Sequence, residues 1–300
     1  MSVKFRHYTD EPFFSMDYQK VRDFLIRINA ERIVSPRFLW GAWEWGITHA
    51  GWDQERQNHI GLWEDDGQIV ALATYESTLG EGFIFTDSQH TALKPELVTY
   101  ARQSLHNQGK LRLLISDHDI ELQRSAFAQG FRPTQDRDRL SMLDIDQLDY
   151  HPLPEGYSFV SLADDWNWHQ YHRVMWRGFN HEGSPPDDEA SIAVRKQMLS
   201  SPMIRPELVL AVAAADGHYV SHCGSWYRPE DTYCYIEPVA TDPDYRRMGL
   251  GKAVVHEAIR RCGALGARQA IVGSEQPFYF NIGFFPFETM TYWSSAAKEG

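Results

Sequence analysis

The chain repeats one order of sequence signals, and this duplication constrains its fold more than any other feature. The Asp66-Gly67 pair, flanked by short apolar runs, is typical of a hairpin turn, and Asp216-Gly217 repeats it about 150 residues later. The Gly130-Phe131 pair recurs as Gly283-Phe284 at nearly the same offset. Two features at nearly one offset indicate two copies of one structural unit.

A short segment, residues 149–156, separates the two copies. It contains two prolines and a glycine, which is typical of a linker or turn. We therefore expect two domains, residues 1–150 and residues 151–300. In each half the pattern predicts early helices, an antiparallel hairpin, a strand that enters a helix, and a final strand and helix. This order predicts an α/β fold with a mixed (α+β) sheet.

The second half contains a strand, a tight turn and a helix start between residues 233 and 252. Residues alternate as in an extended strand, Pro243 ends the strand, and helical spacing of apolar residues begins at Leu250. Gly249 and Gly251 would let an anion approach free backbone N–H groups at the positive end of the helix dipole. The pattern therefore predicts a phosphate-binding turn.

This turn differs from the other common phosphate loops. A dinucleotide fingerprint would need glycine at Val254, and a P-loop would need Ser or Thr at Ala253. The pattern Arg246-x-x-Gly249-x-Gly251 instead resembles the pyrophosphate-binding motif of the GCN5-related N-acetyltransferase (GNAT) superfamily, which binds coenzyme A. Further along, the segment from Phe278 to Phe284 resembles that superfamily's late Leu-Tyr-x-x-x-Gly-Phe element.

The resemblance implies two tandem GNAT-fold domains, of which the first is degenerate. It is strong for residues 155–293 and rests on element order alone for residues 3–146. Where the second half has its glycine turn, residues 87–94 of the first half contain no glycine, and Ala126 stands at the position of Tyr279. We expect acyl-CoA to bind the second domain, and the first to be a GNAT-like domain without a coenzyme A motif.

The resemblance also implies which residues hold acetyl-CoA and which carry the reaction. Glu237 would accept the proton of the attacking amine, and the hydroxyl of Tyr279 would lie near the coenzyme A sulfur. A backbone N–H in the strand before the turn would stabilise the thioester oxygen. Glu237 could also be a solvated strand carboxylate, and Tyr279 a core aromatic. The residues expected to contact the cofactor are Val239, Ala240, Arg246, Arg247, Met248, Gly249, Leu250, Gly251, Lys252 and Tyr279.

Two further segments are candidates for the acceptor site, and three side chains raise the question of a metal site. The polar loop at residues 176–186 and the aromatic residues 289–293 are candidates for the acceptor site. His218, His222 and Cys223 could suggest a metal, but the two histidines are expected to share a strand face with no fourth ligand evident. We therefore expect no metal.

The charge balance limits the partners. The net charge is −12, and no concentrated basic surface is evident, which argues against a nucleic acid partner. The small basic cluster of Arg246, Arg247 and Lys252 suits one anionic cofactor. The longest apolar run, residues 208–215, is far too short to span a bilayer, and no secretory signal is evident. We expect a cytoplasmic monomer or homodimer without a membrane partner.

The predicted function is an acyl-CoA-dependent N-acyltransferase that transfers an acetyl group to a primary amine of a small molecule. The amine would attack the thioester directly in a ternary complex. Two alternatives stay open: a non-catalytic coenzyme A-binding or scaffold protein, and a transferase that uses aminoacyl-tRNA, against which the acidic charge argues.

Overall fold

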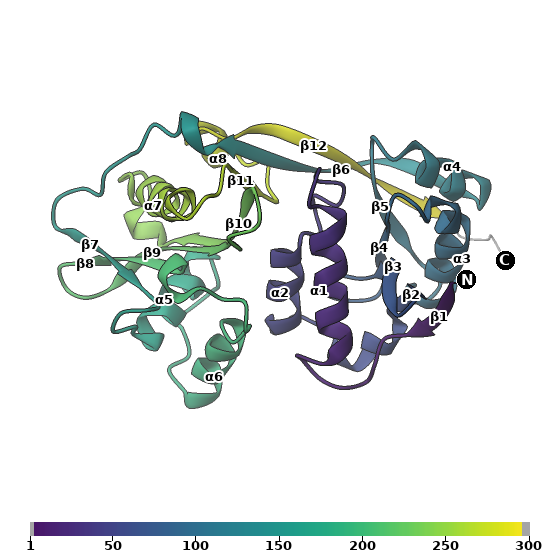
Figure 1. Cartoon of the computed structure of the whole chain (residues 1–300). Helices are drawn as coiled ribbons and strands as arrows, with labels where there is room; N and C mark the ends of the chain where they lie inside the picture. The colour runs from purple at the N-terminus through teal and green to yellow at the C-terminus, as the bar shows by residue number, and fades with distance from the viewer. Residues whose placement is uncertain (1–2, 296–300) are drawn as a thin grey trace. The chain divides into compact units, whose positions relative to one another are not determined.

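The chain forms two compact units. The structure is a computed structural model that describes residues 3–295. Unit 1 contains the residues up to Leu140 together with those from Phe287 onward, and unit 2 contains Ser141–Pro286. Figure 1 shows that each unit is a sheet with helices on both faces.

Unit 1 contains the first five strands, four helices and parts of two long strands. Its elements are β1 (Lys4–His7), α1 (Met16–Ile28), α2 (Trp40–Thr48), β2 (Gly61–Asp65), β3 (Gln68–Thr74), β4 (Glu81–Thr86), α3 (Lys94–Ser104), β5 (Arg112–Ser116), α4 (Ile120–Ala128), the start of β6 (Phe131–Asp144) and most of β12 (Phe285–Ser295). The sheet order is β1-β2-β3-β4-β5-β12. Only β4 and β5 in this series are parallel. Helices α1 and α2 cover one face, and α3 and α4 the other (Figure 1).

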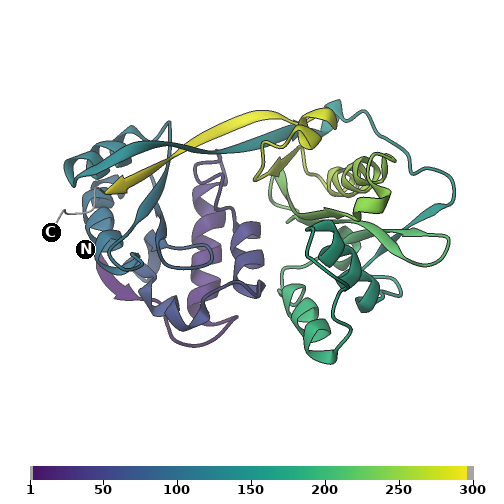
Figure 2. The ribbon, with the colours of Figure 1, turned by 180° about the vertical axis from the view of Figure 1, so that it is seen from behind.

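Unit 2 repeats this plan. Its elements are the end of β6, β7 (Tyr157–Ser161), α5 (Trp168–Gly178), α6 (Glu189–Met198), β8 (Leu210–Ala214), β9 (Tyr219–Trp226), β10 (Tyr233–Thr241), α7 (Leu250–Ala264), β11 (Gln269–Val272) and α8 (Pro277–Asn281). The sheet order is β6-β11-β10-β9-β8-β7, with β10 and β11 parallel and the other neighbours antiparallel. Figures 1 and 2 show α5 and α6 on one face and α7 on the other.

The repeated order predicted from the sequence is confirmed. The two hairpins are β2-β3 and β8-β9, and their Asp-Gly turns fall between the paired strands. The helix predicted after Gly249 is α7, and its apolar positions are buried on the sheet. These buried positions are Leu250, Val254, Val255, Ala258 and Ile259. Burial of each such side chain stabilises the fold by about 1.5–3 kcal/mol.

The two units do not coincide with the halves predicted from the sequence, which meet at residue 150. Residues 141–144 at the end of β6 pair with β11 in unit 2. Conversely, residues 290–294 of β12 pair with β5 in unit 1. Each unit therefore contains a strand from the other repeat, and the compact units begin and end inside β6 and β12.

The middle of β10 is irregular, and this irregularity shapes the region before the predicted phosphate turn. The register of β10 on β9 shifts between Ile236 and Val239, because an extra residue is accommodated there. Pro238 lies in the shift and has no N–H to donate. Gly224 on β9 allows the close approach, since a Cβ there would lie 2.5 Å from the carbonyl oxygen of Glu237.

We expect Gly224→Ala to destabilise the protein. The new methyl group would meet a backbone carbonyl that cannot move without breaking the strand pair, and overpacking of this kind costs about 1–3 kcal/mol. Chemical unfolding of the full chain would measure the loss. Gly46→Ala in α2 is the matched control, because its Cβ would be 3.9 Å from the nearest atom. Equal stability of the two variants would contradict the proposed close contact.

Candidate functional site

The turn that leads into α7 is held by a buried carboxylate. Asp242 is fully buried, and its side chain accepts a hydrogen bond from the N–H of Asp244. Arg177 Nε lies 2.7 Å and Arg173 Nη1 3.0 Å from the Asp242 carboxylate. Burial would raise the pKa of Asp242, but these bonds and charges lower it below its ordinary value. Two α5 arginines thus fix the start of the turn.

The backbone N–H groups at the start of α7 are free. Within the described part of the chain, no acceptor is hydrogen-bonded to the N–H groups of residues 247–252. Arg247 and Gly249 have left-handed backbone conformations, with φ of 65° and 81°. Such alternation turns successive N–H groups toward one side and forms an anion-binding concavity at the helix N-terminus. The sequence predicts a phosphate site at this turn, and the free N–H groups lie at that position.

The three basic residues of the motif have different surroundings. Arg246 is engaged by the protein, because its side chain donates to the carbonyl oxygens of Thr241 and Gly178 and to Asn180 Oδ1. The side chains of Arg247 and Lys252 make no hydrogen bond or ion pair within residues 3–295 and are left available for an anion. Arg246 therefore braces the turn against the end of α5.

The two glycines also differ in what they accommodate. A Cβ on Gly249 would lie 2.8 Å from Nε2 of His151, so an imidazole lies directly over this glycine. A Cβ on Gly251 would lie 2.9 Å from Oγ1 of Thr241 and 3.4 Å from the ring of Phe278. Gly251 thus permits close packing of α7 on β10 and α8, in addition to offering its N–H.

His151 is a candidate site residue that sequence reasoning missed, because it lies in the segment predicted to be a linker. The segment is tied to α7 at two points: the Tyr150 hydroxyl lies 3.2 Å from Glu257 Oε2, and the His151 N–H lies 3.1 Å from His256 Nδ1. His256 Nε2 lies 2.9 Å from the carbonyl oxygen of Ile282. No motif or spacing marks a linker histidine as a ligand before the fold is known.

Strand β10 has an unpaired edge next to this turn. It pairs with β11 only over Tyr233–Tyr235, so residues 236–241 have no strand partner on that side. Val239 is partly exposed and Ala240 is buried. The strand before the turn is thus interrupted. The carbonyl oxygens of Glu237, Ala240 and Thr241 accept hydrogen bonds from the side chains of Trp226, Ser221 and Arg246.

Glu237 and Tyr279, the predicted catalytic pair, both lie in unit 2. The Tyr235 hydroxyl donates to Glu237 Oε2 at 2.5 Å, and Trp226 Nε1 donates to the Glu237 carbonyl oxygen. Tyr279 on α8 is buried and packs edge-on against Phe278 and Phe284. Among the described residues, none is hydrogen-bonded to its hydroxyl. Burial raises the pKa of Tyr279 well above its usual range, with smaller contributions from Cys223 and Glu237.

Other predicted candidates lie elsewhere. Residues 290–293 of the aromatic segment 289–293 pair with β5 in unit 1, so this segment is not part of the unit that carries the turn. The predicted shared face of His218 and His222 is wrong: His218 precedes β9 and pairs with Asp216 at the surface, whereas His222 is fully buried. Residues 3–295 contain no group of three potential metal-binding side chains and no helix long and apolar enough to cross a bilayer.

Comparison with known proteins identifies the second unit. Residues 163–285 match the family model described as acetyltransferase (GNAT) family. Unit 2 is a GNAT domain. The match contains the motif, Glu237 and Tyr279, and the GNAT family consists of N-acetyltransferases that use acetyl-CoA as the acyl donor. No curated protein sequence matches this chain.

Solved structures extend the GNAT fold to the whole chain. A tandem GNAT protein from the clavulanic acid biosynthesis pathway has a TM-score of 0.62 at 13% identity, with 99% of this chain and 100% of that one covered. A GCN5-related N-acetyltransferase from Sphaerobacter thermophilus has a TM-score of 0.57 at 16% identity, with 97% and 95% covered. One from Kribbella flavida has a TM-score of 0.51 at 14% identity, with 76% and 87% covered. The chain therefore has a tandem GNAT fold.

We expect His151→Ala to weaken the binding of coenzyme A about tenfold, which corresponds to the loss of one hydrogen bond to a charged group. Pantetheine has no pyrophosphate, and its affinity should not change. Titration calorimetry would measure both ligands. His218→Ala, a surface change in the same unit, is the control. Unchanged or tighter binding of coenzyme A by His151→Ala would exclude the imidazole from the phosphate site.

Proposed function

We propose that unit 2 is an acyl-CoA-dependent N-acyltransferase, which transfers an acetyl group from acetyl-CoA to a primary amine of a small molecule. The observation that carries the proposal is the row of free N–H groups at residues 247–252, in the motif matched by the GNAT family model. Their dipoles, with Arg247 and Lys252, suit the pyrophosphate of coenzyme A.

The unpaired edge of β10 supports a position for the rest of the cofactor. The pantetheine arm would hydrogen-bond to backbone groups of residues 236–241, which β11 leaves without a strand partner. This would bring the thioester carbonyl to the N–H of Val239 or Ala240. One preorganised donor at a developing oxyanion contributes about 3 kcal/mol to transition-state stabilisation.

Glu237 is proposed as the base. An ordinary alkylamine has a pKa near 10.4 and is protonated at pH 7, so the acceptor must lose a proton to become a nucleophile. The neutral amine then attacks the thioester carbon, the C–N bond forms, and the C–S bond breaks in a ternary complex. Glu237 accepts the amine proton directly or through water. The hydrogen bond from Tyr235 holds its carboxylate in place.

Tyr279 is proposed to stabilise the departing thiolate. Its raised pKa keeps the phenol protonated, which favours a hydrogen bond to sulfur over complete proton transfer. Its hydroxyl has no partner among the described residues, so it is free to serve the ligand. The acceptor is proposed to be a small amine, because the chain is strongly acidic and offers no extended basic surface for nucleic acid.

Thiol release from acetyl-CoA, measured over a panel of small amines, is the experiment that tests this function. Release that depends on an amine would support the acyltransferase. Coenzyme A binding without turnover of any amine would instead favour a non-catalytic coenzyme A-binding protein.

We expect the chain to bind one coenzyme A, and Gly249→Val to abolish that binding, because the added side chain would fill the space at the turn and strain its left-handed backbone. In unit 1 the corresponding helix α3 begins at Lys94, whose ammonium group pairs with Asp119 and Glu121, so no second site is expected. Calorimetry gives the stoichiometry. Gly217→Val, at a hairpin turn with similar backbone strain, is the control. Two equivalent sites would contradict this prediction.

We expect Tyr279→Phe to lower kcat by about 10-fold or more while the affinity for acetyl-CoA changes little, since only the hydroxyl that acts on sulfur is lost. Stability should be almost unchanged, because the removed hydroxyl has no hydrogen-bond partner among residues 3–295. Steady-state kinetics and calorimetry together separate the two effects. Full activity of the variant would remove Tyr279 from the mechanism.

A further inference from the structure

A cluster of buried polar groups lies between α5 and β9, outside the residues assigned above. Six of its side-chain atoms have no hydrogen-bond partner. They are Trp166 Nε1, Gln170 Oε1, Tyr171 Oη, His172 Nε2, and Nδ1 and Nε2 of His222. Tyr171 and His222 are fully buried, and Trp166 and His172 nearly so. Each unsatisfied buried group costs about 1–3 kcal/mol, so this concentration in one place requires a physical reason.

The rings of the cluster are in contact. The ring centroids of Tyr171 and His222 are 4.9 Å apart, and those of Trp166 and Tyr171 are 5.5 Å apart. The backbone of Pro186 lies near His172 and that of Leu210 near His222, but neither reaches hydrogen-bond geometry. The unsatisfied atoms of Trp166, Tyr171 and His222 therefore belong to one packed group of rings, whereas His172 joins it through Arg195, whose charge acts on Tyr171 and His222.

Arg195 on α6 adds a positive charge without a carboxylate partner. Its Nε donates to His172 Nδ1 at 3.0 Å and its Nη1 lies 3.3 Å from the Met198 sulfur. No acidic side chain among the described residues forms an ion pair with it. Burial lowers its pKa, and its charge acts on both Tyr171 and His222. A half-buried guanidinium without an anion is costly unless a ligand supplies one.

The acidic residues whose charges act on His172 are already engaged. Asp188 caps α6, with its carboxylate bonded to the N–H and the hydroxyl of Ser191. Asp187 pairs with His169 at 2.5 Å. Neither serves Arg195.

The available groups are mostly donors. Because His172 Nδ1 accepts from Arg195, its unpartnered Nε2 carries the proton of the neutral ring. The indole N–H of Trp166, the hydroxyl of Tyr171 and the guanidinium of Arg195 are donors as well. The cluster also has two acceptors, which are Gln170 Oε1 and the unprotonated ring nitrogen of His222. A ligand with two acceptor oxygens and a negative charge matches this set, and a carboxylate meets both conditions.

The cluster lies on the α5 side of β10, close in register to the proposed base. His222 is paired with Ala240, three residues after Glu237. Gly178 of α5 packs against Ala240, since a Cβ on Gly178 would lie 2.7 Å from the Cβ of Ala240. The loop that joins α5 to α6, which contains part of the predicted acceptor segment, borders His172 through Pro186.

We propose that this cluster binds the carboxylate of the acceptor, so that the substrate is an amino acid or another amine that carries a carboxylate. That the ligand is the acceptor rests on the proposed acyltransferase function, whereas the binding of a carboxylate rests on the cluster alone. Arg195 supplies the charge, and Tyr171, His172 and Trp166 orient the two oxygens.

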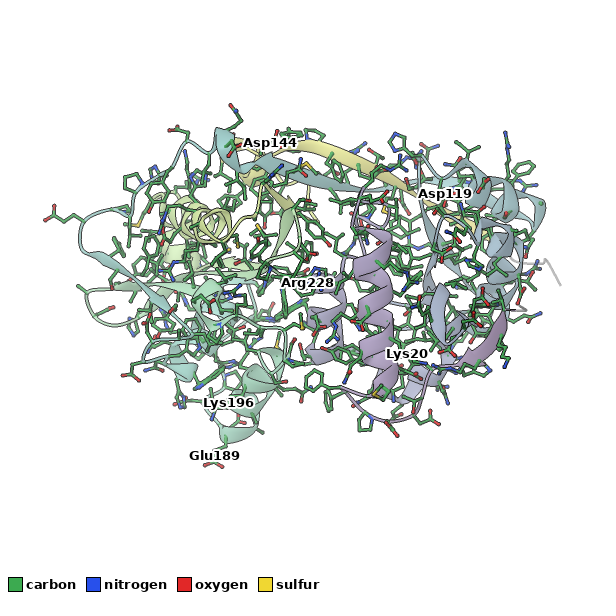
Figure 3. The ribbon with its side chains drawn as sticks, viewed as in Figure 1. Lys20, Asp119, Asp144, Glu189, Lys196 and Arg228 are labelled. Carbon is green, nitrogen blue, oxygen red and sulfur yellow. The ribbon has the colours of Figure 1, made fainter. Side chains whose placement is uncertain are left out.

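The first test needs no turnover. Sodium acetate should raise the melting temperature of the full chain above that in sodium chloride at equal ionic strength, and neutral acetamide should not. Arg195→Gln should remove the shift. Tyr171→Phe, which keeps the shape of the ring, should reduce it. Lys196→Gln changes the exposed neighbour on α6 (Figure 3) and should keep it. Absence of an acetate shift in the wild-type protein would overturn the carboxylate site and leave water as the occupant.

The second test links the site to the acceptor. Thiol release from acetyl-CoA is compared for matched pairs such as glycine and glycinamide, or β-alanine and its amide. For the pair that is turned over faster, kcat/KM should be at least tenfold higher for the carboxylate than for its amide. This ratio should approach one in Arg195→Gln. Lys196→Gln should retain the preference.

The combined outcomes separate the two proposals. Acetate stabilisation that depends on Arg195, with no preference among turned-over amines, would overturn the assignment to the acceptor. The same stabilisation with no acylation of any amine would overturn the acyltransferase and still support the carboxylate site. Turnover without an acetate shift and without a carboxylate preference would leave the acyltransferase and overturn the site.

Discussion

The short pairing between β10 and β11 is the constraint on which the candidate site depends. The two strands are bonded at only three residues, Tyr233–Tyr235, after which the register shift around Pro238 separates the backbone of β10 from a regular ladder. A fully paired β10 would have its N–H and C=O groups committed to neighbours. Strand β10 contacts α7 on one face and α5 on the other. Because of the interruption, its edge beyond Tyr235 has no strand partner.

Much of this arrangement follows from local sequence. The Asp-Gly turns set the hairpins, and the apolar spacing after Gly249 sets α7, because both signals act between residues close in the chain. The phosphate turn was also predictable, since glycine and a helix start are local features. Arg246 was predictable as part of the motif, but its bonds to Gly178 and Asn180 depend on the end of α5 and could not be inferred from spacing.

Long-range features were not predictable in this way. The pairing of β12 with β5 joins residues far apart in sequence, and both repeats contain short, largely buried strands, so nothing local selects the partner. The same holds for His151, which reaches Gly249 only after its segment is fixed on α7. The polar cluster around His222 was hidden for another reason: its residues come from α5, α6 and β9, and each one alone is unremarkable.

The exchange of strands between the repeats has a consequence for the order in which the protein can fold. During synthesis the first repeat emerges with its sheet ending at β5, because β12, which pairs with β5, follows all the other strands of the second repeat. An uncovered strand edge is a template for association with other chains. The first repeat therefore stays incomplete until β12 has been made, and the strand that completes its sheet comes from the second repeat. Each repeat thus depends on the other for the neighbour of one of its strands, which links the folding of the two copies.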